Sequence, residues 1–225
     1  MKKRIFAIAL ALAMLLPVFA VGASAATLEE QGAALLQGTY SIFASGHFTL
    51  KGHDAQGPFA AVADGNRFVE ELVVDWYADA GSFAGFFLKL LLGSKIRLVV
   101  TPDQVLVGFL ERRLYGDLGF LGDFFEELRS LLQTPMIASP VPSDVAEETI
   151  DGKTYICVTA EDGEGAPVKL YYLNGQLKRV VDDNGTDVVD SLSPTADQSY
   201  FSMSGMLKWP FLIVKPLMKR ILIDA

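Results

Sequence analysis

Apolar and polar residues alternate along much of the chain, which predicts a sheet of antiparallel strands. Phe48 and Leu50, for example, alternate with polar neighbours, as in a strand with one face in water. Turn sequences such as Asp64-Gly65-Asn66 and Asn174-Gly175 separate these runs and predict hairpins. The expected strands cover residues 46–54, 58–63, 67–77, 95–100, 105–110, 153–160, 168–173, 177–181 and 186–192.

Several of these strands are apolar on both faces. Val105, Val107 and Phe109 point to one side of their strand, while Leu106 and Leu110 point to the other. A sheet with one face in water has no need of this pattern. We therefore expect either helices against the second face or an apolar cavity lined by it.

Two shorter segments have the character of helices that could cover such a face. Thr27 and Glu30 have the spacing of a capping box, which predicts a helix at about residues 28–37. Residues 81–93 are almost entirely apolar but too few to span a bilayer, so they predict a buried helix or a lid.

Residues 123–133 predict a third, amphipathic helix, capped by Asp123 and ended by Thr134-Pro135. Its apolar positions recur at helical spacing and form one stripe. The residues of this stripe are Phe124, Phe125, Leu128, Leu131 and Leu132.

The first 25 residues have the three-part pattern of a secretory signal peptide. A basic start at Met1–Arg4 precedes an uncharged run, and Ala23 and Ala25 provide the small residues that a signal peptidase requires. The alternative is an uncleaved anchor helix. We expect cleavage after Ala25 and an exported protein, whether secreted, periplasmic or in the cell envelope. The expected mature N-terminus has no cysteine that could carry a lipid anchor.

Charge and length limit the classes of partner. The chain has 19 Lys and Arg against 27 Asp and Glu, and the first 25 residues hold three of the bases, so 16 against 27 remain, a net charge of −11. Such a surface repels phosphate backbones, so no nucleic-acid partner is expected. We expect a monomer with a signal peptide at 1–25, one domain at 26–205 and an apolar, cationic tail at 206–225.

Candidate catalytic groups are sparse. Cys157 is the only cysteine, and its strand-like surroundings predict a buried structural thiol. His47 and His53 lie about 20 Å apart along one strand, too far to share a metal ion. We expect no catalytic residue, metal or cofactor.

Paired acids offer the one opening for catalysis. These pairs fall in turns, in the first turn of a helix or at strand edges, where solvated charge is common. A hydrolase that uses two of them stays open as an alternative. The pairs are Glu70-Glu71, Glu126-Glu127, Glu147-Glu148 and Asp182-Asp183.

The order of elements resembles the bacterial lipoprotein-carrier superfamily, the LolA/LppX-like half-barrels, over residues 27–203. The resemblance is carried by Asp151-Gly152-Lys153-Thr154-Tyr155, by the hairpin of residues 168–181, and by the segment from Ser193 to Phe201. It implies an α+β fold, a curved antiparallel sheet or incomplete β-barrel with helices packed on its concave face. It also implies non-catalytic binding of lipid acyl chains or a lipidated protein.

We expect the apolar cavity to be lined by residues of the two Phe-rich helices and of the strand at 105–110. A domain of the same fold with a filled interior, acting in interaction or sensing, is the main alternative. The expected lining residues are Phe83, Phe86, Phe87, Leu90, Phe124, Phe125, Leu128, Val107 and Phe109.

The tail at 206–225 combines apolar residues with four bases, and Pro210 and Pro216 prevent a continuous spanning helix. It either packs on the domain, which we favour, or lies on a membrane surface. The residues that would then touch the membrane are Lys208, Trp209, Phe211, Lys215, Lys219 and Arg220.

Overall fold

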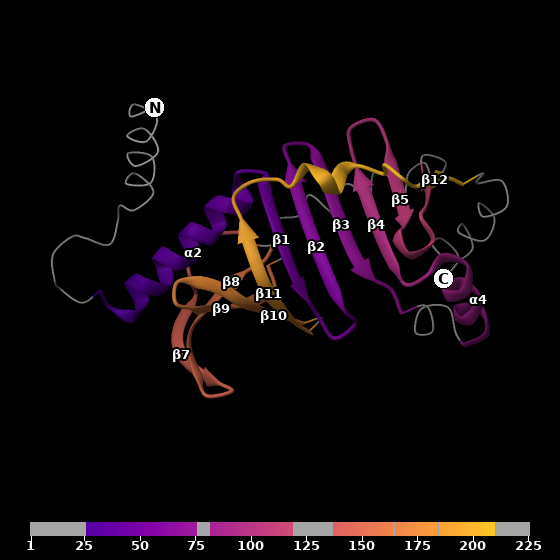
Figure 1. The fold of residues 1–225 in the computed structure, drawn as a ribbon. Helices are drawn as coiled ribbons and strands as arrows, with labels where there is room; N and C mark the ends of the chain where they lie inside the picture. Colours follow the sequence, from indigo (N-terminus) through magenta and orange to yellow (C-terminus); the bar gives the residue numbers. More distant parts are fainter. Residues whose placement is uncertain (1–25, 76–81, 119–136, 164, 184, 210–225) are drawn as a thin grey trace, which may run out of the picture.

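The computed structural model describes residues 26–75, 82–118, 137–163, 165–183 and 185–209, and their fold is drawn in Figure 1. These residues form one unclosed sheet of twelve strands, in the order β12-β6-β5-β4-β3-β2-β1-β11-β10-β9-β8-β7. The predicted antiparallel sheet is confirmed, and the described strands add one parallel pair, β12 with β6.

Helices are few in the described part of the chain: α2 (Leu28–Ala44), α4 (Ser82–Leu92) and the short 3-10 helices η1 (Leu110–Arg112) and η3 (Gln198–Phe201). Within these ranges, no helix has the length and apolar character needed to cross a bilayer. The strands are β1 (His47–His53), β2 (Pro58–Asp64), β3 (Arg67–Val73), β4 (Lys95–Val100), β5 (Val105–Phe109), β6 (Leu114–Asp117), β7 (Asp144–Ile150), β8 (Lys153–Glu161), β9 (Pro167–Leu173), β10 (Gln176–Asp182), β11 (Gly185–Ser193) and β12 (Leu207–Lys208).

The sheet consists of two antiparallel meanders joined side by side. Strands β1 to β6 form the N-terminal half and strands β7 to β11 form the C-terminal half, each with sequential neighbours paired. The halves meet where β1 pairs with β11, through Thr49 opposite Ser193 and, after a bulge, Gly52 opposite Val189. Segments far apart in the sequence therefore share one continuous sheet.

Hairpin turns form where the sequence predicts them. Asn174 and Gly175 both have positive φ, 52° and 77°, as a two-residue turn between β9 and β10 requires. Asp151 and Gly152 do the same between β7 and β8, with φ of 53° and 74°. The predicted strands are found within a few residues of their expected bounds, whereas β6, β7 and β12 were not expected.

Helix α2 begins at its predicted capping box, in which Glu30 N–H donates to Thr27 Oγ1 and Thr27 N–H donates to the Glu30 carboxylate. Its predicted end at residue 37 is wrong, because the helix continues to Ala44. The extra turns carry Tyr40 and Phe43, which pack on the sheet core and outweigh the weak helix propensity of Gly38.

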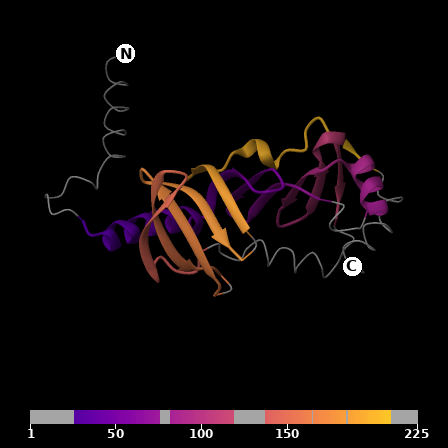
Figure 2. The same ribbon diagram turned by 90° about the horizontal axis from the view of Figure 1, so that it is seen from below.

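Helix α2 packs against β1, β7 and β8. A flat sheet would hold β1 and β8 about 19 Å apart, four strand spacings, which is wider than one helix. Contacts with both ends of this span require the C-terminal half to depart from a flat sheet, and Figure 2 shows its strands beside the helix. Gly32 allows the close approach to β7, since a Cβ there would overlap the Val145 side chain. We call the face that contacts α2 the inner face and the opposite one the outer face.

Candidate ligand-binding face

The inner face of the C-terminal half is filled by α2. Leu36, Leu170 and Val158 are fully buried in one cluster with the side chains of β1 and β8 to β11. Tyr172 reaches across this core, and its hydroxyl donates to Thr39 Oγ1 of α2 at 3.0 Å. Burial raises the pKa of Tyr172 to about 12, so the hydroxyl stays a neutral donor. This half has the packing of a closed hydrophobic core.

The inner face of the N-terminal half carries a second apolar cluster, which we call the β4–β5 cluster. Register places its strand residues in neighbouring rows, with Ile96 opposite Phe109, Leu98 opposite Val107 and Val100 opposite Val105. Its buried members are Leu92, Val100, Val105, Val107, Phe109 and Leu118, and its partly buried members are Phe68, Val74, Ile96, Leu98, Leu114 and Trp209.

The predicted lining residues fall into three groups. Val107 and Phe109 are in the β4–β5 cluster, 4% and 1% exposed. Phe86 and Leu90 lie on α4 and are 52% and 55% exposed, while α4 contributes Leu92 to the cluster. The remaining positions stay predictions: the side chains of Phe83 and Phe87 are not described, and Phe124, Phe125, Leu128 and the whole helix expected at 123–133 lie outside the described residues.

A carboxyl group stands within this apolar surface. Glu70 lies on the inner face of β3, opposite Ala61 of β2 and Leu98 of β4. Burial raises its pKa, which means that the surroundings favour the neutral acid. Within the described residues, Glu70 has no hydrogen-bond or ion-pair partner. It is therefore a polar group available to a ligand on an otherwise apolar face.

The neighbouring acid, Glu71, points to the outer face and is only 6% exposed. Its carboxylate forms an ion pair with the Arg97 guanidinium, and Lys95 Nζ lies 3.6 Å away. The expectation that Glu70 and Glu71 are a solvated pair is wrong. Side chains alternate along β3, so the two carboxyls lie on opposite faces of the sheet, where Glu70 is partly buried and Glu71 is buried. Glu71 therefore belongs to an ion pair on the outer face, whereas Glu70 lies on the apolar inner face.

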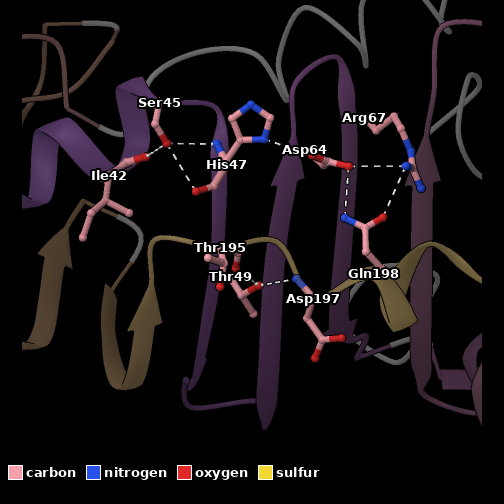
Figure 3. A network of polar contacts seen from close by, with 9 residues as sticks. All are labelled: Ile42, Ser45, His47, Thr49, Asp64, Arg67, Thr195, Asp197 and Gln198. Carbon is pink, nitrogen blue, oxygen red and sulfur yellow. Dashed lines mark hydrogen bonds and ion pairs between the residues drawn. The ribbon is translucent and has the colours of Figure 1, made fainter. Parts of the chain in front are cut away.

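The outer face of the N-terminal half is covered by residues 194–209, which we call the strap. Figure 1 shows the strap running across the strands from β11 to β12. Thr49 Oγ1 donates to the Thr195 carbonyl at 2.8 Å and accepts from the Asp197 N–H at 2.8 Å, as Figure 3 shows. Asp64 accepts from Gln198 Nε2 and Arg67 Nη1, and the hydrogen bonds from Gln198 and His47 lower the pKa of Asp64.

Further along the strap, Arg97 donates to the Ser202 carbonyl at 2.9 Å, and Arg67 lies over the Phe201 ring. Gly108 of β5 lets the strap come close, because a Cβ there would stand 3.0 Å from Met203 Sδ. Val62, Val69 and Val99 are buried beneath the strap. The outer face of this half is thus covered by the strap, and we take the inner face as the candidate site.

The strap also shows how the tail enters the domain. Leu207 and Lys208 pair with Leu114 and Tyr115 of β6, and Trp209 packs edge-on against Phe109 with ring centroids 6.2 Å apart. Trp209 therefore brings the chain round the edge of the sheet to the β4–β5 cluster. Residues 210–225, including Phe211, Lys215, Lys219 and Arg220, lie outside the described residues, so the fate of the tail stays a prediction.

The cysteine and the two histidines, the remaining candidates for catalysis or metal binding, have surroundings that indicate a structural role. Cys157 is 3% exposed, as predicted, and burial together with Glu148 raises its thiol pKa to about 11, so it stays protonated. His47 Nδ1 lies 2.9 Å from Asp64, and His53 Nδ1 lies 3.5 Å from Asp190. Within the described ranges, no three metal-binding side chains converge.

Acids do gather near the β10–β11 turn. Burial raises the pKa of Asp187, and Asp182 and Asp54 add to the effect. The Asp54 carboxylate accepts the N–H groups of Gln56 and Gly57, and Asp182 accepts that of Gly185. Asp54 and Asp182 therefore stabilise turns, which accounts for their position.

No protein-family model matches the chain, and no curated protein matches it either. Among solved structures, the chain is similar to an uncharacterized conserved protein from Thermus thermophilus, at 12% sequence identity and a TM-score of 0.37. The match covers 79% of this chain and 98% of that protein. The case for a function rests on the geometry of the inner face.

Proposed function

We propose that the protein is an extracytoplasmic, non-catalytic carrier or binding protein for a lipid or a lipidated protein. In this proposal the helices lie on the concave face of the sheet, and an acyl chain lies along the inner face of the N-terminal half. The observation that supports the proposal is the β4–β5 cluster, an apolar cluster on the face opposite the strap. The Glu70 carboxyl lies on the same face, beside Leu98, and has no hydrogen-bond or ion-pair partner among the described residues.

Burial of an acyl chain on such a site releases enough free energy for micromolar binding. A micromolar Kd corresponds to about 8 kcal/mol. Burial of about ten methylenes supplies this at roughly 0.8 kcal/mol each, and a long-chain fatty acid has more methylenes to offset the cost of association. Glu70, protonated more readily than an exposed glutamate, can donate a hydrogen bond to the carbonyl or carboxylate at the polar end of the lipid.

The experiment is titration of the purified protein with a fluorescent long-chain fatty acid, comparing Leu98→Gln with Leu106→Gln. Both leucines are partly buried and lie on adjacent central strands, but Leu98 faces the inner side and Leu106 faces the strap. We expect micromolar binding that Leu98→Gln weakens about tenfold or more and that Leu106→Gln leaves unchanged. Equal effects of the two variants, or no binding at all, would contradict the proposal.

A second candidate is a domain of the same fold with a filled interior, acting in interaction or sensing. It is favoured by the near-complete burial of Val107 and Phe109 by the chain itself, at 4% and 1% exposure. This candidate predicts no fatty-acid binding together with full stability of the purified protein. The same titration, combined with a thermal melt, therefore separates the two candidates.

A further inference from the structure

Exposed apolar side chains gather at one end of the described structure. Of its five large hydrophobic residues with high exposure, Phe86, Leu90 and Leu91 are on α4 and Leu207 is on β12, with exposed fractions between 51% and 72%. Figures 1 and 2 both place α4 and β12 at the end of the sheet away from α2. We call α4, η1, Arg113 and β12 together the tip.

The parts of the tip are directly connected. Arg112 Nη2 donates to the Leu90 carbonyl at 2.7 Å, which joins η1 to α4. The Leu207 N–H donates to the Arg113 carbonyl at 2.8 Å, which joins β12 to the end of η1. The exposed apolar residues thus lie on elements that are hydrogen-bonded to one another, and monomeric soluble proteins seldom expose several large apolar side chains in one region without a partner.

The charge of the tip is opposite to that of the chain. Lys89, Arg112, Arg113 and Lys208 are all exposed bases, and the tip has one acid, Glu111. Glu111 is already engaged, since its carboxylate accepts the Ser94 N–H at 3.3 Å. Four bases against one acid give the tip a charge of +3, in a chain whose net charge is −8. This local excess indicates a negatively charged partner.

We propose that the tip docks on the surface of an anionic lipid bilayer. Apolar residues on one short helix, flanked by bases, are the arrangement by which interfacial segments insert among acyl chains while lysine and arginine reach the headgroups. A nucleic acid would satisfy the bases but would leave Phe86, Leu90 and Leu91 in water. The docking does not rest on the acyl-binding proposal, because it uses the outside of the tip and not the inner face.

The test is cosedimentation of the purified protein with vesicles of mixed phosphatidylglycerol and phosphatidylcholine, and with vesicles of phosphatidylcholine alone. The charge variant is Lys89→Gln with Lys208→Gln, and its matched control is Lys153→Gln with Lys178→Gln on β8 and β10. The apolar variant is Leu90→Gln, and its control is Val141→Gln, since Val141 is 70% exposed in the other half.

We expect binding to the anionic vesicles, weakened roughly 30-fold by the charge variant, because each base near such a surface contributes about fivefold. Leu90→Gln should weaken binding about fivefold, because the exposed half of the Leu90 side chain would no longer contribute apolar surface that docking buries in the bilayer. Neither control should change binding. For the unaltered protein, added salt should release it from the vesicles, which tests the proposal even where a variant fails to fold.

Three results would overturn the proposal: equal binding to the neutral vesicles, equal losses in the tip variants and their controls, or no binding. Self-association that Leu90→Gln abolishes, seen by analytical ultracentrifugation without vesicles, would also overturn it and make the tip a contact between copies of the chain. Failure here leaves fatty-acid binding on the inner face untouched, so the two proposals are tested separately.

Discussion

The two halves of the sheet share one inner face but are covered from opposite sides. In the C-terminal half, α2 fills the inner face, and the Tyr172–Thr39 hydrogen bond fixes it to the strands. In the N-terminal half, the strap covers the outer face through Thr49, Asp64 and Arg97. One sheet therefore carries a buried apolar cluster on the inner face of each half, with α2 on that face in one half and the strap on the opposite face in the other.

The largest expected effect of a single substitution on the free energy of unfolding is in the C-terminal half, where α2 packs on the inner face. Leu36→Ala removes a side chain that is 0% exposed beneath α2, and we expect a loss of about 3 kcal/mol in the free energy of unfolding. Urea denaturation measures it. Met203→Ala in the strap is the comparison, with a smaller loss because Met203 is only partly buried. A larger loss at Met203 would reverse our account of which half holds the core.

The ion pair beneath the strap gives the next largest effect. Arg97→Met leaves the Glu71 carboxylate buried without its main partner, and because the Arg97 side chain is still 17% exposed we expect a loss of about 2 kcal/mol. The double variant with Glu71→Gln should recover more than half of it, as measured by the same denaturation. An unrecovered loss would show that Arg97 acts through Tyr200 and Ser202 alone.

The smallest effect is a gain. Glu70→Gln removes a carboxyl whose pKa is raised by burial, so we expect a small gain in the free energy of unfolding at neutral pH. The folded state binds more protons than the unfolded state between the ordinary glutamate pKa and the raised value, so the stability of the unaltered protein falls as pH rises through that window. Thermal melts should show the gain at pH 7 and its disappearance at pH 4. A gain that is equal at both pH values would point to a cause other than the carboxyl.

Alternation and turn chemistry predicted the strands that have one apolar face and end in Asn-Gly or Asp-Gly. They did not predict β7, whose edge position requires few apolar residues and tolerates Glu147 and Glu148. Nor did they predict the full length of α2, because Tyr40 and Phe43 pack on a core built from both Phe48 of β1 and distant strands of the C-terminal half. Local pattern is informative where local burial decides the structure, and fails where distant packing does.

The candidate site was predicted in the same uneven way. Two-sided strands led us to predict that Val107 and Phe109 line a cavity, and that stays a prediction, although both residues are buried. Glu70 was grouped with Glu71 because adjacent acids look alike in a sequence. Reading the period of two through residues 67–73 separates them, with Glu70 on the side of Phe68 and Glu71 on the side of Val69. The tip had no sequence signal, since it joins α4 to β12 across more than a hundred residues.

The most direct test of acyl binding on the inner face is native mass spectrometry of the protein purified from the cells that produce it, followed by lipid extraction. We expect one copy of the chain carrying one acyl lipid, released on denaturation, and a Leu98→Gln variant purified in the same way that carries markedly less lipid. A ligand-free mass for the unaltered protein, or equal lipid on the Leu98→Gln variant, would contradict the account.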